Sequence, residues 1–113
     1  MPVLRRNQFD KQPSEKFPID VNFAGGLPNG ATKLVSATVS AIKWPRREPE
    51  NTSDATSEVL FSTNAVIVGV IETKARFLVQ DGQDGFEYKF TILGIFDNGS
   101  ILEEEIFMRV REE

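Results

Sequence analysis

The sequence FEYKFTILGIF–DNG–SILEEEIFMRVR, residues 86–111, decides the fold class of this chain. Two β-prone runs flank Asp97-Asn98-Gly99, and Asn-Gly is the strongest short-range signal for a β-hairpin, because a tight turn needs residues that accept positive φ. We therefore predict that Phe86–Phe96 and Ser100–Arg111 form an antiparallel hairpin.

The register of this hairpin is open to two interpretations. A two-residue turn at Asn98-Gly99 would place Phe90 opposite Phe107 and would set apolar residues of one strand beside Glu103 and Glu105. A three-residue turn or a bulge shifts the pairing by one residue and exchanges the faces. We favour the shifted register, because burial of several apolar side chains at roughly 1.5–3 kcal/mol each outweighs one turn preference. Its expected core residues are Tyr88, Phe90, Ile92, Leu102, Ile106, Met108 and Val110, and its outward residues are Glu87, Lys89, Glu103, Glu105, Arg109 and Arg111.

Further β-prone segments precede the hairpin. Phe17–Phe23 alternates apolar and polar residues, and Lys33–Trp44 places Val35, Ala37, Val39 and Ala41 on one face, which we expect to point inward. Glu58–Ser62, Ala65–Glu72 and Lys74–Gln80 follow as short segments. No apolar helical period persists over more than two turns. We predict an all-β, immunoglobulin-like antiparallel sandwich of about seven strands over residues 17–113.

Two polar segments lie outside this pattern. Residues 1–16 contain Pro2 and Pro13 and read as an extended N-terminal arm, which is either ordered by a neighbour or a frayed terminus. Residues 45–57 (PRREPENTSDATS) read as a long loop, either a disordered excursion or a contact element. Candidate partner contacts are Leu4, Arg5, Arg6 and Phe9 in the arm and Arg46 and Arg47 in the loop, with solvated surface as the alternative for the arginine pairs.

Composition excludes several classes of chemistry. The 113 residues contain no cysteine and no histidine, which removes thiol chemistry, the usual zinc ligands and the usual proton shuttle. A net charge of −4 disfavours nucleic acid as a partner. Asp81, Asp84, Asp97 and Asn98 match no calcium-loop spacing, and turns favour these residues anyway. We predict no enzyme activity, no catalytic residues, no cofactor and no metal site. The N-terminus has no apolar core of the kind a signal peptide needs, and the apolar runs are too short for a membrane span, so we expect a soluble product made in the cytoplasm.

The segment around Gly82, Gly85 and Tyr88 resembles a known family. The pattern G-x-x-G-x-x-Y, followed by the Asn98-Gly99 hairpin, is similar to that of the fiber–tail adaptor proteins of tailed bacteriophages. The approach to the first strand, with Lys11, Pro13, Asp20 and Phe23, fits the same group. The similarity covers most of the chain loosely and residues 82–111 best, and the loop at 45–57 departs from compact members.

The resemblance implies a small immunoglobulin-like component of the virion. The two glycines would allow a sharp entry into the strand, and the tyrosine would act as a corner residue, with its hydroxyl bonded to nearby backbone and its ring packed inward. The chain would join fibers or neighbouring components to the tail or neck, in several copies within a symmetric particle. Its partners would be other virion proteins, with no nucleic acid and no membrane. The alternative is a capsid decoration or carbohydrate-binding module, which would need outward aromatic residues; Trp44, Phe61 and Phe77 are the candidates.

Overall fold

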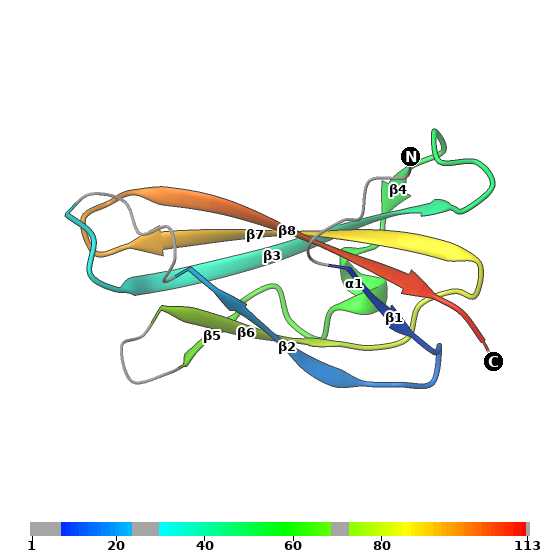
Figure 1. The fold of residues 1–113 in the computed structure, drawn as a ribbon, viewed down its shortest axis with the longest axis horizontal. Helices are drawn as coiled ribbons and strands as arrows, with labels where there is room; N and C mark the ends of the chain where they lie inside the picture. Colours follow the sequence, from blue (N-terminus) through cyan, green and yellow to red (C-terminus); the bar gives the residue numbers. More distant parts are fainter. Residues whose placement is uncertain (1–7, 24–29, 69–72, 113) are drawn as a thin grey trace.

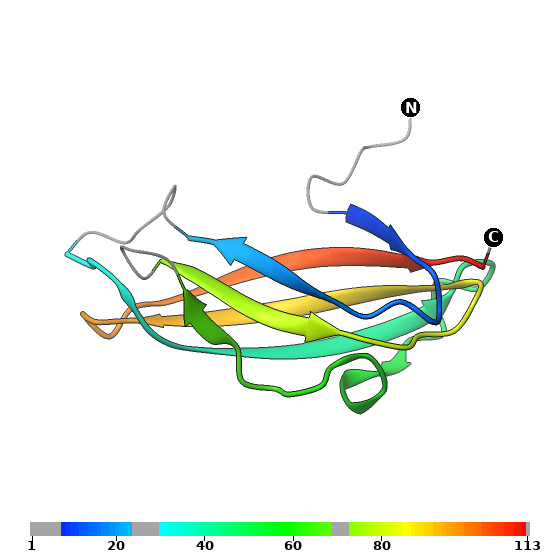
Figure 2. The same ribbon diagram turned by 90° about the horizontal axis from the view of Figure 1, so that it is seen from below.

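The chain folds into two packed β-sheets, which lie one above the other in Figure 1, and in Figure 2 the smaller sheet lies in front of the larger one. The structure is a computed structural model, and it describes residues 8–23, 30–68 and 73–112. Within these ranges one sheet has five strands in the order β1-β8-β7-β3-β4, and the other has three in the order β2-β6-β5 (Figure 1). The elements are β1 (Gln8–Lys11), β2 (Phe17–Asn22), β3 (Leu34–Pro45), β4 (Ser53–Asp54), α1 (Thr56–Val59), β5 (Val66–Val68), β6 (Lys74–Val79), β7 (Phe86–Phe96) and β8 (Ile101–Val110). The predicted β-sandwich is confirmed.

The strand order is that of an immunoglobulin-like domain. The neighbours β8, β7, β3 and β4 stand where strands G, F, C and C′ stand in such a domain, and β2, β6 and β5 stand where B, E and D do. The first strand, β1, pairs in parallel with the last strand, β8, from Gln8 opposite Phe107 to Lys11 opposite Val110. The two ends of the described chain are therefore fixed together in one sheet.

The C-terminal hairpin adopts the shifted register. Ile95 pairs with Ile101 and Tyr88 with Met108, so Asp97, Asn98 and Gly99 form a three-residue turn. The amide of Phe96 donates to the carbonyl of Ser100 at 2.9 Å, and Gly99 has φ of +87°, the geometry of a turn closed by a bulge. The preference for this register is confirmed.

The core lies between the inner faces of the two sheets. The hairpin contributes seven buried side chains, Tyr88, Phe90, Ile92, Phe96, Ile106, Met108 and Val110, while Leu102 is half-buried. The smaller sheet and its flanks contribute Val21, Phe23, Ala75, Phe77 and Val79. The rings of Phe77 and Phe90 meet across the two layers with centroids 5.4 Å apart.

One residue of β3 points to the opposite face from the one predicted. Ala37, Val39 and Ala41 face the core as expected, but Val35 is 58% exposed. The pairing of β3 with β7 shifts between Leu34 and Ser36, and this irregularity turns Leu34 inward and Val35 outward. The inward assignment of Val35 is therefore wrong.

The two segments set apart as arm and loop are partly regular. Gln8–Lys11 lies in the five-stranded sheet, and the rings of Phe9 and Phe17 are 5.8 Å apart, so the arm expected over residues 1–16 overlaps the sandwich; residues 1–7 lie outside the described ranges. Within 45–57, β4 pairs with β3. The strand predicted at Glu58–Ser62 is wrong, because Thr56–Val59 is helical and Leu60 makes only an isolated bridge to Val79.

Candidate interaction surfaces

The motif residues Gly82, Gly85 and Tyr88 form a corner before β7. Both glycines have positive φ, +100° and +85°. The Tyr88 ring is fully buried, and its hydroxyl accepts a hydrogen bond from the Gln83 amide at 2.7 Å. This is the role that the resemblance implied for the tyrosine, and it is the arrangement of a tyrosine corner.

A second set of contacts at this corner was not predicted. The Tyr88 hydroxyl donates to Oε2 of Glu58 at 2.5 Å, and Oε1 of Glu58 accepts from Nζ of Lys43 at 2.6 Å. Burial, together with the bond to Glu58, raises the pKa of Tyr88 above its ordinary range. The network ties α1, β3 and β7 together. Glu58 was missed because the surrounding sequence is typical of a strand, in which its side chain would point to solvent.

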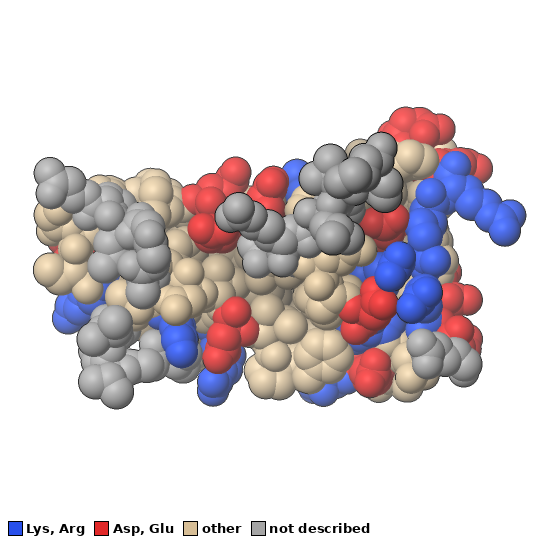
Figure 3. All heavy atoms as spheres, in the orientation of Figure 1, with Lys and Arg blue, Asp and Glu red and all other residues tan. Residues whose placement is uncertain are grey.

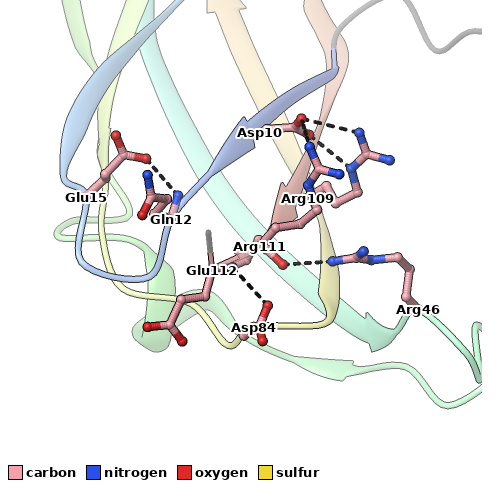
Figure 4. Close-up of polar contacts among 9 residues, drawn as sticks. Asp10, Gln12, Glu15, Arg46, Asp84, Arg109, Arg111 and Glu112 are labelled. Atoms are coloured by element: carbon pink, nitrogen blue, oxygen red, sulfur yellow. Dashed lines mark hydrogen bonds and ion pairs between the residues drawn. The ribbon is translucent and has the colours of Figure 1, made fainter.

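Charged residues meet where β1 ends beside β8 (Figure 4). Asp10 accepts hydrogen bonds from Arg109 at 3.0 and 3.3 Å and from Arg111 at 3.1 Å. The bond from Arg109 is the main reason that the pKa of the Asp10 carboxyl lies below its ordinary value. Figure 3 shows Lys, Arg, Asp and Glu side chains close together at the end of the molecule where the C terminus is found. This corner fastens the first strand to the last.

Lys11 is a buried cation within the same region. Only 2% of the residue is exposed, and its Nζ donates to the carbonyls of Gln12 at 2.8 Å, Pro13 at 3.3 Å and Asp81 at 2.5 Å. Desolvation lowers the pKa of its ammonium group. Lys11 belongs to the segment that carries the family resemblance, but its burial has no local sequence signal, because the carbonyl of Asp81 is supplied from 70 residues away.

The predicted partner contacts divide into three groups. Leu4, Arg5 and Arg6 lie outside the described residues. Phe9 is partly buried against the core, and Arg46 supports the fold, because its guanidinium donates to the Val110 carbonyl at 2.9 Å and its amide donates to the Gly85 carbonyl. Arg47 is exposed.

The outward aromatic group expected for a carbohydrate-binding module does not form. Trp44 and Phe77 are buried, with 8% and 3% of the residue exposed, while Phe61 is 68% exposed. Trp44 lies at the end of β3 and Phe77 in the middle of β6, where alternation turns it toward the core. The alternative of a carbohydrate-binding module therefore lacks the group of outward aromatics that it would need, and Trp44 occupies the core or rim position at a strand end that is the favoured interpretation of this residue.

An exposed aliphatic patch lies on the outer face of the five-stranded sheet, at its hairpin end. We define this aliphatic patch by four residues: Val35, Leu93, Ile95 and Ile101. Ile95 and Ile101 pair directly across β7 and β8, and Ser36, next to Val35, pairs with Ile95. The exposed fractions of Val35 and Ile101 are similar, at 58% and 61%. The patch was missed because Leu93, Ile95 and Ile101 were not among the outward residues named for the hairpin and Val35 was assigned to the core.

The rest of this outer face is polar, and each strand carries one kind of polar side chain. On β3 it carries Ser36, Thr38 and Ser40, all exposed. On β8 it carries Glu103 and Glu105, also exposed, which pair across the ladder with Leu93 and Thr91 of β7. The face therefore consists of a hydroxyl column, a central column that is apolar toward the hairpin turn, and an acidic column.

Among the described residues, no three acidic side chains come close enough together to hold a metal ion. Over the same ranges, no helix has the length and apolar character needed to cross a membrane.

No protein-family model matches this chain, and no curated protein matches it.

Proposed function

We propose that the chain is a non-enzymatic structural component of a tailed-phage virion, an adaptor that joins fibers or neighbouring components to the tail or neck. The observation that carries this proposal is the aliphatic patch. Contiguous exposed apolar surface with a polar surround is typical of protein–protein contact sites. Three of its four residues lie on two long paired strands of 11 and 10 residues, which hold the side chains in fixed positions.

The corner at Tyr88 supports the link to the adaptor family. The three motif residues on which the resemblance rests, Gly82, Gly85 and Tyr88, come together at one corner and are used as the resemblance implies. Because a tyrosine corner recurs in many immunoglobulin-like sandwiches, it supports the fold more strongly than the function.

Repetition in a particle would strengthen a small contact surface. Four aliphatic side chains bind weakly alone, but several copies on one symmetric particle bind together, and the second contact is then effectively intramolecular. The acidic column beside the patch favours partners with basic or hydroxyl groups around an apolar centre and repels nucleic acid.

Virion composition tests the proposal directly. Mass spectrometry of particles purified from a phage whose genome encodes this chain should find it at a fixed copy number. In the same phage, Ile101→Lys should reduce incorporation, while Val66→Lys on the other sheet should not, since Val66 is equally exposed at 63%. Particles that assemble and infect without the chain would overturn the proposal.

A carbohydrate-binding or decoration module is the second candidate, and one observation favours it. Phe61 is 68% exposed beside a shallow pocket of about 210 Å³ whose lining includes Pro18, Val66 and Leu78. Nζ of Lys16 lies over this ring, 4.9 Å from its centroid, so an apolar sugar face would stack on the other side of the ring. Glycan-array binding that is lost in Phe61→Ala would support this candidate, and an array without signal would count against it.

A further inference from the structure

The three columns of the outer face occupy matching levels along the strands. Thr38, Leu93 and Glu103 lie side by side at one level, because β3 pairs Thr38 with Leu93 and β8 pairs Glu103 with Leu93. Ser40, Thr91 and Glu105 form the next level in the same way. The hydroxyl and acidic columns therefore flank the central strand symmetrically.

This arrangement is self-complementary under one particular two-fold rotation. If a second copy packs face to face about an axis parallel to β7, then β7 lies over β7 and β8 lies over β3 of the other copy. Carboxylates, which accept hydrogen bonds, then face hydroxyl groups, which donate them. If the second copy is turned so that β8 lies over β8, Glu103 and Glu105 of one copy face Glu103 and Glu105 of the other, and this repulsion between like charges costs energy.

We propose that the aliphatic patch binds a second copy of this chain, with the two five-stranded sheets packed face to face about this axis. Ile95 then meets Ile95 of the second copy, and Ile101 faces Val35. Glu103 faces Thr38, and Glu105 faces Ser40.

The charge at Lys89 sets a limit on the contact. Lys89 lies on the central strand, so the rotation brings it toward Lys89 of the second copy, although its Nζ already pairs with Glu105 at 3.1 Å. Aligned sheets cross at about 30°, so their ends diverge away from the point of closest contact. The closest contact therefore belongs at the hairpin end, and the Lys89 end lies where the sheets separate.

The expected dimer is weak. The patch has four residues, whereas a standard stable interface has roughly 20–30 residues a side and buries roughly 800 Å² per partner. This inference rests on the proposed docking role of the patch but names its occupant. The two proposals can fail separately. If the chain stays monomeric but still needs Ile101 to enter particles, the docking role of the patch stands and the dimer is excluded.

Sedimentation velocity of the full chain tests the dimer. From about 1 µM to about 1 mM, the range for a small interface, the wild type should shift from monomer toward dimer. Ile95→Asp places two carboxylates on the axis and should weaken association at least about tenfold. Val66→Asp is the matched control on the other sheet and should leave association unchanged. Circular dichroism checks that both variants fold. A wild type that stays monomeric throughout, or equal weakening by both variants, would overturn the proposal.

Cross-linking tests the orientation, and the absence of cysteine in the chain makes it specific. Packed sheets lie about 10 Å apart and strands about 4.8 Å apart, so Val35 would lie about 10 Å from Ile101 of the second copy and about 14 Å from Val35 of that copy. With a short bismaleimide, a mixture of Val35→Cys and Ile101→Cys should give cross-linked dimer, and Val35→Cys alone should give much less. The reverse pattern would overturn this orientation.

Discussion

The phenolic oxygen of Tyr88 lies 2.5 Å from Oε2 of Glu58, a residue 30 positions away in the chain. The same oxygen accepts a hydrogen bond from the Gln83 amide. One buried hydroxyl therefore joins the helical turn α1 to the start of β7. Removing one member of such a pair leaves the other desolvated and without its bond, so these contacts should contribute measurably to stability.

Tyr88→Phe should reduce the free energy of unfolding by about 1–3 kcal/mol. It keeps the packing of the ring but removes the hydrogen bonds that the Gln83 amide and the Glu58 carboxylate make to the hydroxyl. Urea unfolding followed by the fluorescence of the single tryptophan measures this change. Ser14→Ala removes an exposed hydroxyl and serves as the control, with an expected effect close to zero. Equal stability of Tyr88→Phe and the wild type would contradict the prediction.

The raised pKa of Tyr88 predicts a loss of stability at high pH. Burial raises the pKa in the folded state above the ordinary value of about 10, so the unfolded state releases its proton first. The stabilisation is therefore complete below about pH 10 and is lost as the pH rises above that value. Because the chain has a single tyrosine, the ultraviolet absorbance of the phenolate reports this group alone.

In the folded protein, phenolate absorbance should appear only together with unfolding, as followed by circular dichroism. In concentrated urea it should appear near pH 10. A folded protein whose phenolate forms at the pH seen in urea would show that the hydroxyl is not held as described.

The ion pairs of Asp10 predict a smaller effect at low pH. Hydrogen bonds from Arg109 lower the pKa of Asp10, so its stabilisation is present above the ordinary value of about 3.9 and is lost as the pH falls below it. Asp10→Asn should cost about 1 kcal/mol or less at pH 7, because 46% of the Asp10 side chain is exposed and solvent screens the pairs. Urea unfolding at pH 7 and pH 3 measures the difference, with the exposed Glu50→Gln as control. A cost that is equal at both pH values would contradict this assignment.

The hairpin register could be predicted from the sequence because burial of several apolar side chains decides it. Seven hairpin side chains are buried in the observed pairing, and the other register would have put Glu103 and Glu105 on the face of Phe90 and Ile92. The position of Val35 could not be predicted in this way, since the single irregularity between Leu34 and Ser36 reverses a pattern that is otherwise correct.

Features that depend on distant residues escaped sequence reasoning for another reason. The strand β1 exists because Gln8–Lys11 pairs with residues about 100 positions away, and four residues leave no periodic pattern of their own. Lys11 and Glu58 are held by partners supplied from other segments. The aliphatic patch combines both difficulties, because it joins a misassigned residue of β3 to two residues of β7 and one of β8.

The two motif glycines differ in what surrounds them, and this difference gives the last prediction. A Cβ added to Gly82 would lie 2.8 Å from Cγ2 of Val110, in addition to the strain of φ +100°. A Cβ added to Gly85 would meet nothing within 4 Å, so only the strain of φ +85° remains. Gly85→Ala should cost about 1–2 kcal/mol, the ordinary penalty for a side chain in the left-handed region. Gly82→Ala should cost about 1 kcal/mol more than Gly85→Ala, because β8 must shift or Val110 must leave its rotamer. Urea unfolding of both variants measures the order, and a Gly85→Ala protein less stable than Gly82→Ala would contradict the close packing of this corner against β8.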